Sequence, residues 1–170
     1  MSCKPSADYQ FSLSSSCPAN CEYCYLQITQ GEKPFMKIFL NIEEILEVIQ
    51  SYIDGNAPNI TAFECASITD PISLEYLSGN LKRCIEFFGK SSKGGLRLVT
   101  KFDDVEPFLK LKHKQHTKFR FTVNLRYVIN NFEHNTSDFH ERVRGCYNCW
   151  IPNRVLNSTY YDICNLERRI

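Results

Sequence analysis

Strand-like and helix-like patterns alternate along most of this 170-residue chain, and this alternation limits the folds open to it. The expected strands are short apolar runs at 11–13, 59–66, 95–102 and 118–124. The expected helices, with apolar residues at helical spacing, lie at 41–53, 73–88 and 105–114, with Asn41 and Ser73 as N-caps of the first two. Such units of about 30 residues predict an α/β fold, a partial (β/α) barrel of about four parallel strands with crossover helices.

Polar and reactive residues follow each expected strand. They are the cysteine-rich segment 17–24, then 67–70, then Lys101, and finally Asn124. In parallel sheets, functional side chains gather at the carboxyl ends of the strands. We therefore expect these four positions to lie together at one edge of the sheet.

Composition and charge exclude several classes of protein. The chain is 43% hydrophobic, which suffices for a core, and its net charge of +1 argues against a strongly basic nucleic-acid module, although a local basic face remains open. No apolar run reaches the roughly 18 residues of a membrane span. The first residues lack the apolar core of a secretory signal. We therefore expect a cytoplasmic protein with no membrane partner.

Three of the nine cysteines are closely spaced. Cys17, Cys21 and Cys24 stand in the pattern Cys-x3-Cys-x2-Cys, within the segment SCPANCEYCYLQ. Three such thiolates can bind three irons of a [4Fe-4S] cluster and leave the fourth iron open to a ligand. A cytoplasmic location favours this metal-binding interpretation over disulfides.

Zinc offers two alternative interpretations of the cysteines. A structural zinc site at the three-cysteine segment would need a fourth ligand, and no further Cys or His lies nearby at zinc-finger spacing. A second zinc module could use Cys146 and Cys149, in the segment CYNC.

The three-cysteine pattern is the signature of radical S-adenosylmethionine (radical SAM) enzymes, and longer stretches resemble one family among them, spore photoproduct lyase. These stretches are CKPSADY (3–9), CPANCEYCYLQ (17–27), NIEEIL (41–46), FECASITD (63–70), LKRCIEFFG (81–89), RLVTKF (97–102) and KFRFTVNLRYVINNFEHNTS (118–137). The resemblance runs from about residue 3 to residue 143.

The resemblance implies a carbon–carbon lyase that repairs DNA in the cytoplasm of the spore. Family enzymes split 5-thyminyl-5,6-dihydrothymine, the thymine dimer that ultraviolet light forms in spore DNA. The implied cofactors are a [4Fe-4S] cluster and S-adenosyl-L-methionine (AdoMet), which together yield a 5′-deoxyadenosyl radical. The implied partners are UV-damaged DNA and an electron donor such as ferredoxin or flavodoxin.

The resemblance also assigns roles to individual residues. The cluster ligands would be Cys17, Cys21 and Cys24. The residues that match family positions near AdoMet or the cluster are Tyr23, Tyr25, Thr69, Lys101 and Thr122. Tyr25 could relay hydrogen, and Asp70 would line the substrate pocket. For Lys101 a solvated lysine at a strand end is the alternative, and for Thr122 an ordinary strand threonine.

The residue that returns hydrogen to the substrate departs from the family pattern. The family has a cysteine there, in a stretch like FEAACTSD, whereas this chain has Ser67. An O–H bond is stronger than an S–H bond, so serine is a poor hydrogen donor to a carbon radical. Cys65 is a possible substitute, and the alternative is that it is simply a buried strand residue. Cys84 is expected to be a small buried residue of a helix.

Length is the second departure, because family members are roughly twice as long. We expect a partial radical SAM domain at 1–143 and a tail without family resemblance at 144–170. Degenerate codons for 144–160, read from the second base, permit family-like residues such as Glu-Ala-Ala and Gly-Tyr-Pro. This suggests a frameshift near codon 144. An inactive fragment, or a radical SAM protein with another substrate, are the remaining alternatives.

Overall fold

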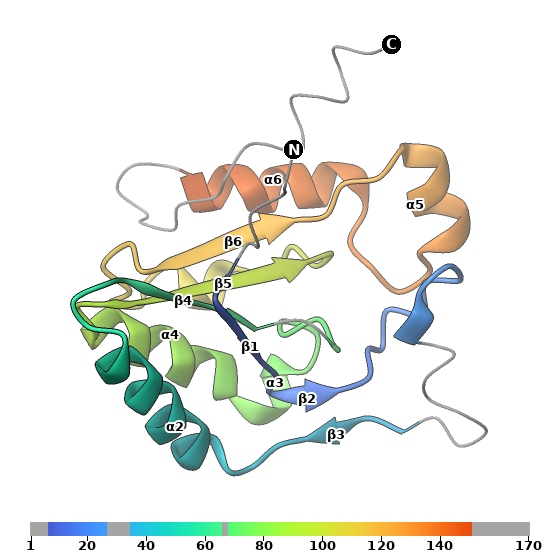
Figure 1. Ribbon diagram of the computed structural model, residues 1–170. Helices are drawn as coiled ribbons and strands as arrows, with labels where there is room; N and C mark the ends of the chain where they lie inside the picture. Colours follow the sequence, from blue (N-terminus) through green and yellow to red (C-terminus); the bar gives the residue numbers. More distant parts are fainter. Residues whose placement is uncertain (1–6, 27–34, 66–67, 151–170) are drawn as a thin grey trace, which may run out of the picture.

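The computed structural model describes residues 7–26, 35–65 and 68–150 (Figure 1). In this part of the chain, the central sheet has four parallel strands in the order β1-β4-β5-β6. They are β1 (Tyr9–Phe11), β4 (Thr61–Cys65), β5 (Gly94–Thr100) and β6 (Thr117–Phe121). The parallel α/β sheet predicted from the sequence is confirmed, although β1 begins two residues before the expected strand.

A short ribbon joins the sheet to the first long helix. β2 (Ser14–Ser15) pairs antiparallel with β3 (Lys37–Ile38), and Phe39 donates its N–H to the Leu13 carbonyl at 3.0 Å. Nothing in the sequence pattern indicated this pair, because two-residue strands carry no measurable period.

Two helices, α2 (Ile42–Gly55) and α4 (Asn80–Lys90), pack side by side and cover one face of the sheet (Figure 1). Every second residue of β4, β5 and β6 is buried, and these residues meet the apolar faces of the two helices. The most completely buried members of this core include Phe63, Ile85, Phe88, Leu96, Leu98 and Phe119. Burying one such side chain contributes about 1.5–3 kcal/mol, so this face holds the sheet to the helices.

The helix expected at 73–88 is two helices. Gly79 breaks it with a left-handed φ of 65°, which leaves the short α3 (Glu75–Ser78) before α4. The Glu75 carboxylate accepts the backbone N–H groups of Leu81 and Lys82 at 2.8 and 3.0 Å, and so caps α4. Ser73, the expected cap, instead donates its hydroxyl to the Asp70 carbonyl at 2.6 Å.

Two other helix predictions need correction. Asn41 does precede α2, but its side chain donates to the Glu44 carboxylate at 3.0 Å and makes no cap to a backbone group. The helix expected at 105–114 is only a 3-10 turn, η1 (Glu106–Phe108). Pro107 supplies no N–H there, and the chain turns away at Lys114 and Gln115, both with positive φ.

Two helices that the sequence analysis did not predict follow β6. They are α5 (Arg126–Phe132) and α6 (Phe139–Trp150), and α6 packs on β6. Asp138 and Glu141 begin α6 with a reciprocal capping box, in which each side chain accepts the other residue's N–H at 2.7 Å. The helix runs past residue 143 into a stretch whose pattern did not indicate one. No helix in the described residues is long and apolar enough to span a membrane.

Candidate functional site

A cavity of about 140 Å³ opens at the carboxyl edge of the central sheet. The segment between β2 and residue 26, the loop after β4, and the ends of β5 and β6 all contribute to its wall. The predicted site residues that line it are Cys17, Cys21, Cys24, Thr69, Asp70, Lys101 and Thr122. The structure therefore brings together side chains that are up to about a hundred residues apart in the chain.

The three cysteines of the loop differ in exposure. Cys21 is buried, whereas Cys17 and Cys24 are partly exposed, and all three are free thiols. Burial raises the pKa of Cys17, and raises that of Cys21 to about 11 even though the nearby Lys101 acts in the opposite direction. The thiols of Cys17 and Cys21 are therefore protonated at neutral pH, and a bound metal would have to displace those protons.

The cysteine loop lies against the segment that follows α5. Cys21 forms an isolated antiparallel bridge with Glu133. On either side of this bridge, Glu22 donates its N–H to the Phe132 carbonyl at 3.0 Å, and Asn135 donates its N–H to the Ala19 carbonyl at 3.1 Å. Backbone hydrogen bonds thus fix the loop against a segment more than a hundred residues later in the sequence.

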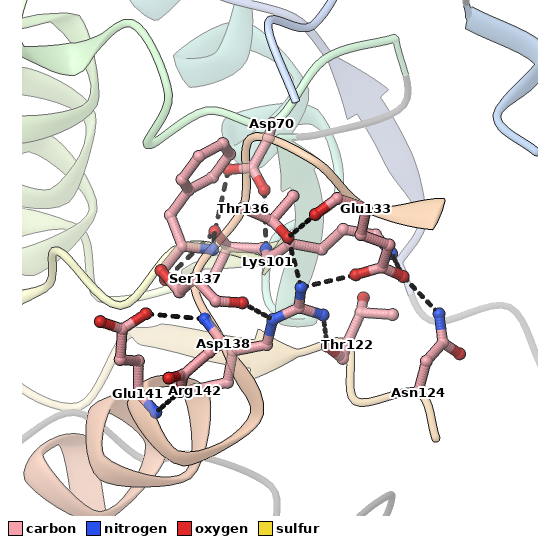
Figure 2. A network of polar contacts seen from close by, with 12 residues as sticks. Asp70, Lys101, Thr122, Asn124, Glu133, Thr136, Ser137, Asp138, Glu141 and Arg142 are labelled. Atoms are coloured by element: carbon pink, nitrogen blue, oxygen red, sulfur yellow. Dashed lines mark hydrogen bonds and ion pairs between the residues drawn. The ribbon is translucent and has the colours of Figure 1, made fainter. Parts of the chain in front are cut away.

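Glu133 is the centre of a polar network beside the cavity (Figure 2). One carboxylate oxygen, Oε1, accepts from the Lys101 ammonium at 2.6 Å, from the Asn124 amide at 2.5 Å and from the Tyr23 hydroxyl. The other, Oε2, accepts from Arg142 at 2.5 Å. Burial alone would raise the pKa of Glu133, but the hydrogen bonds from these donors outweigh it and lower the pKa to about 2.

Arg142 is a completely buried cation, with every donor nitrogen of its guanidinium engaged (Figure 2). Besides Glu133, it donates to the carbonyls of Ser137 and Thr122 at 2.8 and 2.9 Å and to the Thr136 hydroxyl at 2.6 Å. Sequence reasoning missed both Glu133 and Arg142. Glu133 lies in the family-like stretch 118–137, but nothing in that stretch marked it as a site residue, and Arg142 lies beyond it. The Asp138–Glu141 capping pattern could have revealed the helix that carries Arg142.

The two tyrosines of the cysteine loop have different surroundings. The Tyr23 hydroxyl donates to Glu133 and accepts from Lys101 at 2.5 Å and from Asn124 at 2.9 Å. Burial of the hydroxyl, followed by the hydrogen bond to Glu133, raises the pKa of Tyr23 well above its usual value. Tyr25 is exposed and is not among the described residues that line the cavity.

Asp70 connects the loop after β4 to the end of β5. Its carboxylate accepts the N–H groups of Ile72 and Lys101 at 3.1 and 2.8 Å and the Thr100 hydroxyl at 2.9 Å. Burial raises its pKa to about 6 in spite of these bonds. The neighbouring Thr69 is also buried and accepts a hydrogen bond from the Ser14 hydroxyl at 3.1 Å.

The other cysteines among the described residues lie in the core. Cys65 and Cys84 are both fully buried, as expected for Cys84, and Cys65 is not among the described residues that line the cavity. Burial raises the pKa of both thiols. Cys146 and Cys149 are buried on α6. Ser67, the expected hydrogen-donor position, lies outside the described residues.

These features define a class: a parallel α/β protein in which a three-cysteine loop lies over the carboxyl ends of the strands, as expected of a radical SAM domain. Comparison with known families makes the assignment specific. The family model for spore photoproduct lyase matches residues 1–151. The chain belongs to the spore photoproduct lyase family.

Individual curated relatives of this chain are named spore photoproduct lyase. A spore photoproduct lyase from Clostridium acetobutylicum is 45% identical over 158 residues, which cover 93% of this chain and 45% of that protein. One from Geobacillus is 46% identical over 144 residues, covering 85% of this chain and 42% of that protein. The chain thus spans less than half the length of the curated relatives it matches.

This chain is also similar to solved structures of spore photoproduct lyase. Spore photoproduct lyase complexed with dinucleoside spore photoproduct is 39% identical with a TM-score of 0.83, covering 99% of this chain and 50% of that one. A double mutant with bound AdoMet and dinucleoside spore photoproduct is 44% identical with a TM-score of 0.79, covering 86% of this chain and 43% of that one.

Proposed function

We propose that this chain is the part of a spore photoproduct lyase that binds the cluster and AdoMet, in an enzyme that splits 5-thyminyl-5,6-dihydrothymine in UV-damaged DNA. The observation that carries the proposal is the single cavity shared by Cys17, Cys21, Cys24, Lys101 and Thr122. The family membership supports it, as do the AdoMet and the dinucleoside lesion in the related structures. The site would act in the spore cytoplasm, with ferredoxin or flavodoxin as electron donor.

The donor set of the cavity suits a [4Fe-4S] cluster better than a single ion. No three His, Cys, Asp or Glu side chains among residues 7–26, 35–65 and 68–150 are grouped to hold one metal ion. A cluster makes a different demand, because each thiolate binds a separate iron. With the cluster bound, AdoMet would supply the 5′-deoxyadenosyl radical that takes hydrogen from the lesion.

The other residues of the cavity would bind and orient AdoMet. An ammonium has three donor hydrogens, and in the described structure Glu133 and Tyr23 take two from Lys101. The third is available to a ligand carboxylate in the cavity, whose wall Lys101 helps to form. Thr69 and Thr122 add hydroxyl groups to the same wall.

Hydrogen return is the step in which this chain departs from its family. Cys65 is completely buried in the core, which supports a packing role over that of substitute donor. We infer that Ser67 at the donor position returns hydrogen poorly and that Tyr25 relays it. In a parent protein of full family length, Ser67→Cys should then increase clean repair, whereas Cys65→Ala should leave repair unchanged. Clean repair that Cys65→Ala abolishes would show that Cys65 is the donor.

Iron binding tests the proposed site directly. The chain, reconstituted anaerobically with iron and sulfide, should be brown and should contain about four irons and four sulfides per chain. Cys21→Ala should lose this content, whereas the matched control Cys149→Ala, which removes another buried thiol, should keep it. A colourless chain would contradict the proposal, and loss of metal from the Cys149 variant alone would favour the zinc alternative at Cys146 and Cys149.

Two assays separate the proposal from an inactive fragment and from an enzyme with another substrate. The reduced, reconstituted chain should cleave AdoMet to 5′-deoxyadenosine, because that step needs only the cysteine loop and the AdoMet residues. A parent of full family length should then convert the dinucleoside spore photoproduct. AdoMet cleavage without any conversion by the parent would point to another substrate, and the absence of both reactions to an inactive chain.

A further inference from the structure

Contacts within the protein fix the position of the Glu133–Arg142 ion pair, without any contribution from a ligand. Arg142 is anchored by acceptors on three separate residues in addition to Glu133, and both side chains are inaccessible to solvent. The backbone of Glu133 is held as well, through its bridge to Cys21. The Glu133 carboxylate therefore cannot move toward or away from the cavity without breaking several hydrogen bonds.

The Lys101 side chain depends on that carboxylate for its direction. Lys101 follows the last residue of β5, and its ammonium lies 2.6 Å from Glu133 Oε1 and 2.5 Å from the Tyr23 hydroxyl. A lysine side chain has four rotatable bonds and loses conformational entropy when it is fixed. Because Glu133 holds the ammonium beforehand, a ligand does not have to order this side chain.

We propose that Glu133 and Arg142 are positioning residues that set the affinity of the cavity for a ligand bearing a carboxylate. Arg142 fixes Glu133, and Glu133 fixes the Lys101 ammonium where it meets the carboxylate of the amino-acid part of AdoMet. This inference rests on the proposed function, because it takes AdoMet as the ligand. It adds that the selection of the carboxylate group depends on a buried ion pair that does not itself line the cavity.

A selective loss of affinity distinguishes positioning from a general contribution to folding. AdoMet carries the amino-acid carboxylate, whereas 5′-methylthioadenosine has the same nucleoside and lacks that group. Removing the Glu133 charge releases Lys101, so AdoMet binding should weaken while binding of 5′-methylthioadenosine stays the same. A pair that only stabilised the fold would affect both ligands alike.

The binding experiment compares Glu133→Gln with a matched control. Glu43→Gln makes the same change in an exposed ion pair, Glu43–Arg83 at 3.0 Å. Dissociation constants for both ligands are measured by calorimetry on anaerobic protein with equal iron content. Glu133→Gln should weaken AdoMet about tenfold and 5′-methylthioadenosine less than twofold, and the control should change neither. Equal changes for both ligands, or none, would overturn the inference.

Glu133→Asp provides a second variant that keeps a charge beside the buried Arg142. Its carboxylate is one methylene shorter and cannot reach both Arg142 and Lys101, so the same selective loss of AdoMet affinity is expected. If circular dichroism shows that Glu133→Gln does not fold, the binding experiment on Glu133→Asp tests the inference in its place. AdoMet affinity equal to that of the unaltered chain would then refute the inference.

Amine acylation tests the position of Lys101 without any ligand. The chain is treated with an N-hydroxysuccinimide acetate ester, and each lysine is followed by mass spectrometry. Release from Glu133 should raise the acylation rate of Lys101 several-fold in either variant, while the exposed Lys110 stays constant as an internal reference. If the unaltered chain binds no AdoMet, the proposed function fails and this rate alone decides the inference. An unchanged Lys101 rate would refute it.

Discussion

Asp70 and Glu133 are two buried carboxylates that bind the same lysine in different ways. Asp70 accepts the backbone N–H of Lys101, whereas Glu133 accepts its ammonium. Their solvent exposure is similar, at 8% and 3%, yet their pKa values move in opposite directions, to about 6 for Asp70 and to about 2 for Glu133. Burial therefore does not decide the sign of the shift.

The donors account for the difference. Burial raises the pKa of any carboxyl group, because it removes water from the charged form. The donors to Asp70 are neutral N–H and hydroxyl groups, which compensate only in part. Glu133 receives hydrogen bonds from the cation Lys101, from the neutral Tyr23, from the cation Arg142 and from the neutral Asn124, and these four together outweigh the effect of burial. Asp70 therefore connects two segments of backbone, whereas Glu133 forms ion pairs with two cationic side chains.

Removing the Glu133 carboxylate should have the largest effect on stability. Glu133→Ala leaves Arg142 buried without its counter-ion, and breaking such a pair costs about 3–5 kcal/mol of unfolding free energy. Glu43→Ala, in the exposed pair with Arg83, should cost less than about 1 kcal/mol. Urea denaturation of both variants measures the difference. Similar losses of unfolding free energy for the two variants would show that the buried pair is no more costly to break than the exposed pair.

The dependence of stability on pH should differ in sign for the two carboxylates. The pKa of Asp70 is raised from 3.8 to about 6, so its contribution to stability is greatest below 3.8 and is lost as the pH rises through 6. The pKa of Glu133 is lowered from 4.5 to about 2, so its contribution is present above 4.5 and is lost as the pH falls toward 2.

Unfolding free energies at pH 4 and pH 7 test the Asp70 part of this expectation. Relative to Asp70→Asn, which does not titrate, the unaltered chain should lose roughly 2–3 kcal/mol between these two values. A relative gain in unfolding free energy over the same interval would mean that the pKa of Asp70 is lowered. The neutral donors would then be sufficient to outweigh the effect of burial.

Asp70→Asn at neutral pH should cost less than any change at Glu133. The amide keeps one oxygen for Ile72 and Thr100, but its NH₂ group then faces the Lys101 N–H, donor against donor. The expected loss is about 1–2 kcal/mol, because an unsatisfied donor is partly offset by the removal of a buried charge. Thermal or urea unfolding beside Glu133→Gln provides the test, and a larger loss for Asp70→Asn would reverse the ranking.

Thr100→Val should have the smallest effect. It removes one neutral donor from Asp70 and the acceptor of the Phe102 N–H, while keeping nearly the same volume in a buried position, and should cost about 1 kcal/mol. The pKa of Asp70 should rise further, because its charged form loses a hydrogen bond. Carboxyl ¹³C chemical shifts, followed through a pH titration, report this directly. A pKa that stays constant would show that the hydroxyl contributes nothing to the balance at Asp70.

The sequence predicted strands in which hydrophobic residues recur periodically, and it predicted the site residues that stand at a characteristic spacing. Strands β4, β5 and β6 alternate buried and half-buried residues, and the three cysteines follow a fixed interval, so both could be found without coordinates. β1, which has no buried residue, was expected two residues too late. The break at Gly79 could not be found in this way, because helical periodicity continues across it and only the backbone angle differs. Glu133 and Arg142 also escaped prediction, since a buried ion pair is defined by which segments meet in space.

The bridge between Cys21 and Glu133 has a consequence for the biosynthesis of the chain. The hydrogen bond from Tyr23 to Glu133 spans 110 residues, so the cysteine loop leaves the ribosome long before the segment that supports it has been made. At translation rates of about 5–20 residues per second, this delay lasts roughly 5–20 s. Throughout that interval the nascent chain lacks the segment around Glu133 that supports the cysteine loop. The three thiols of the loop are then exposed to oxidants and to metal ions in the cell.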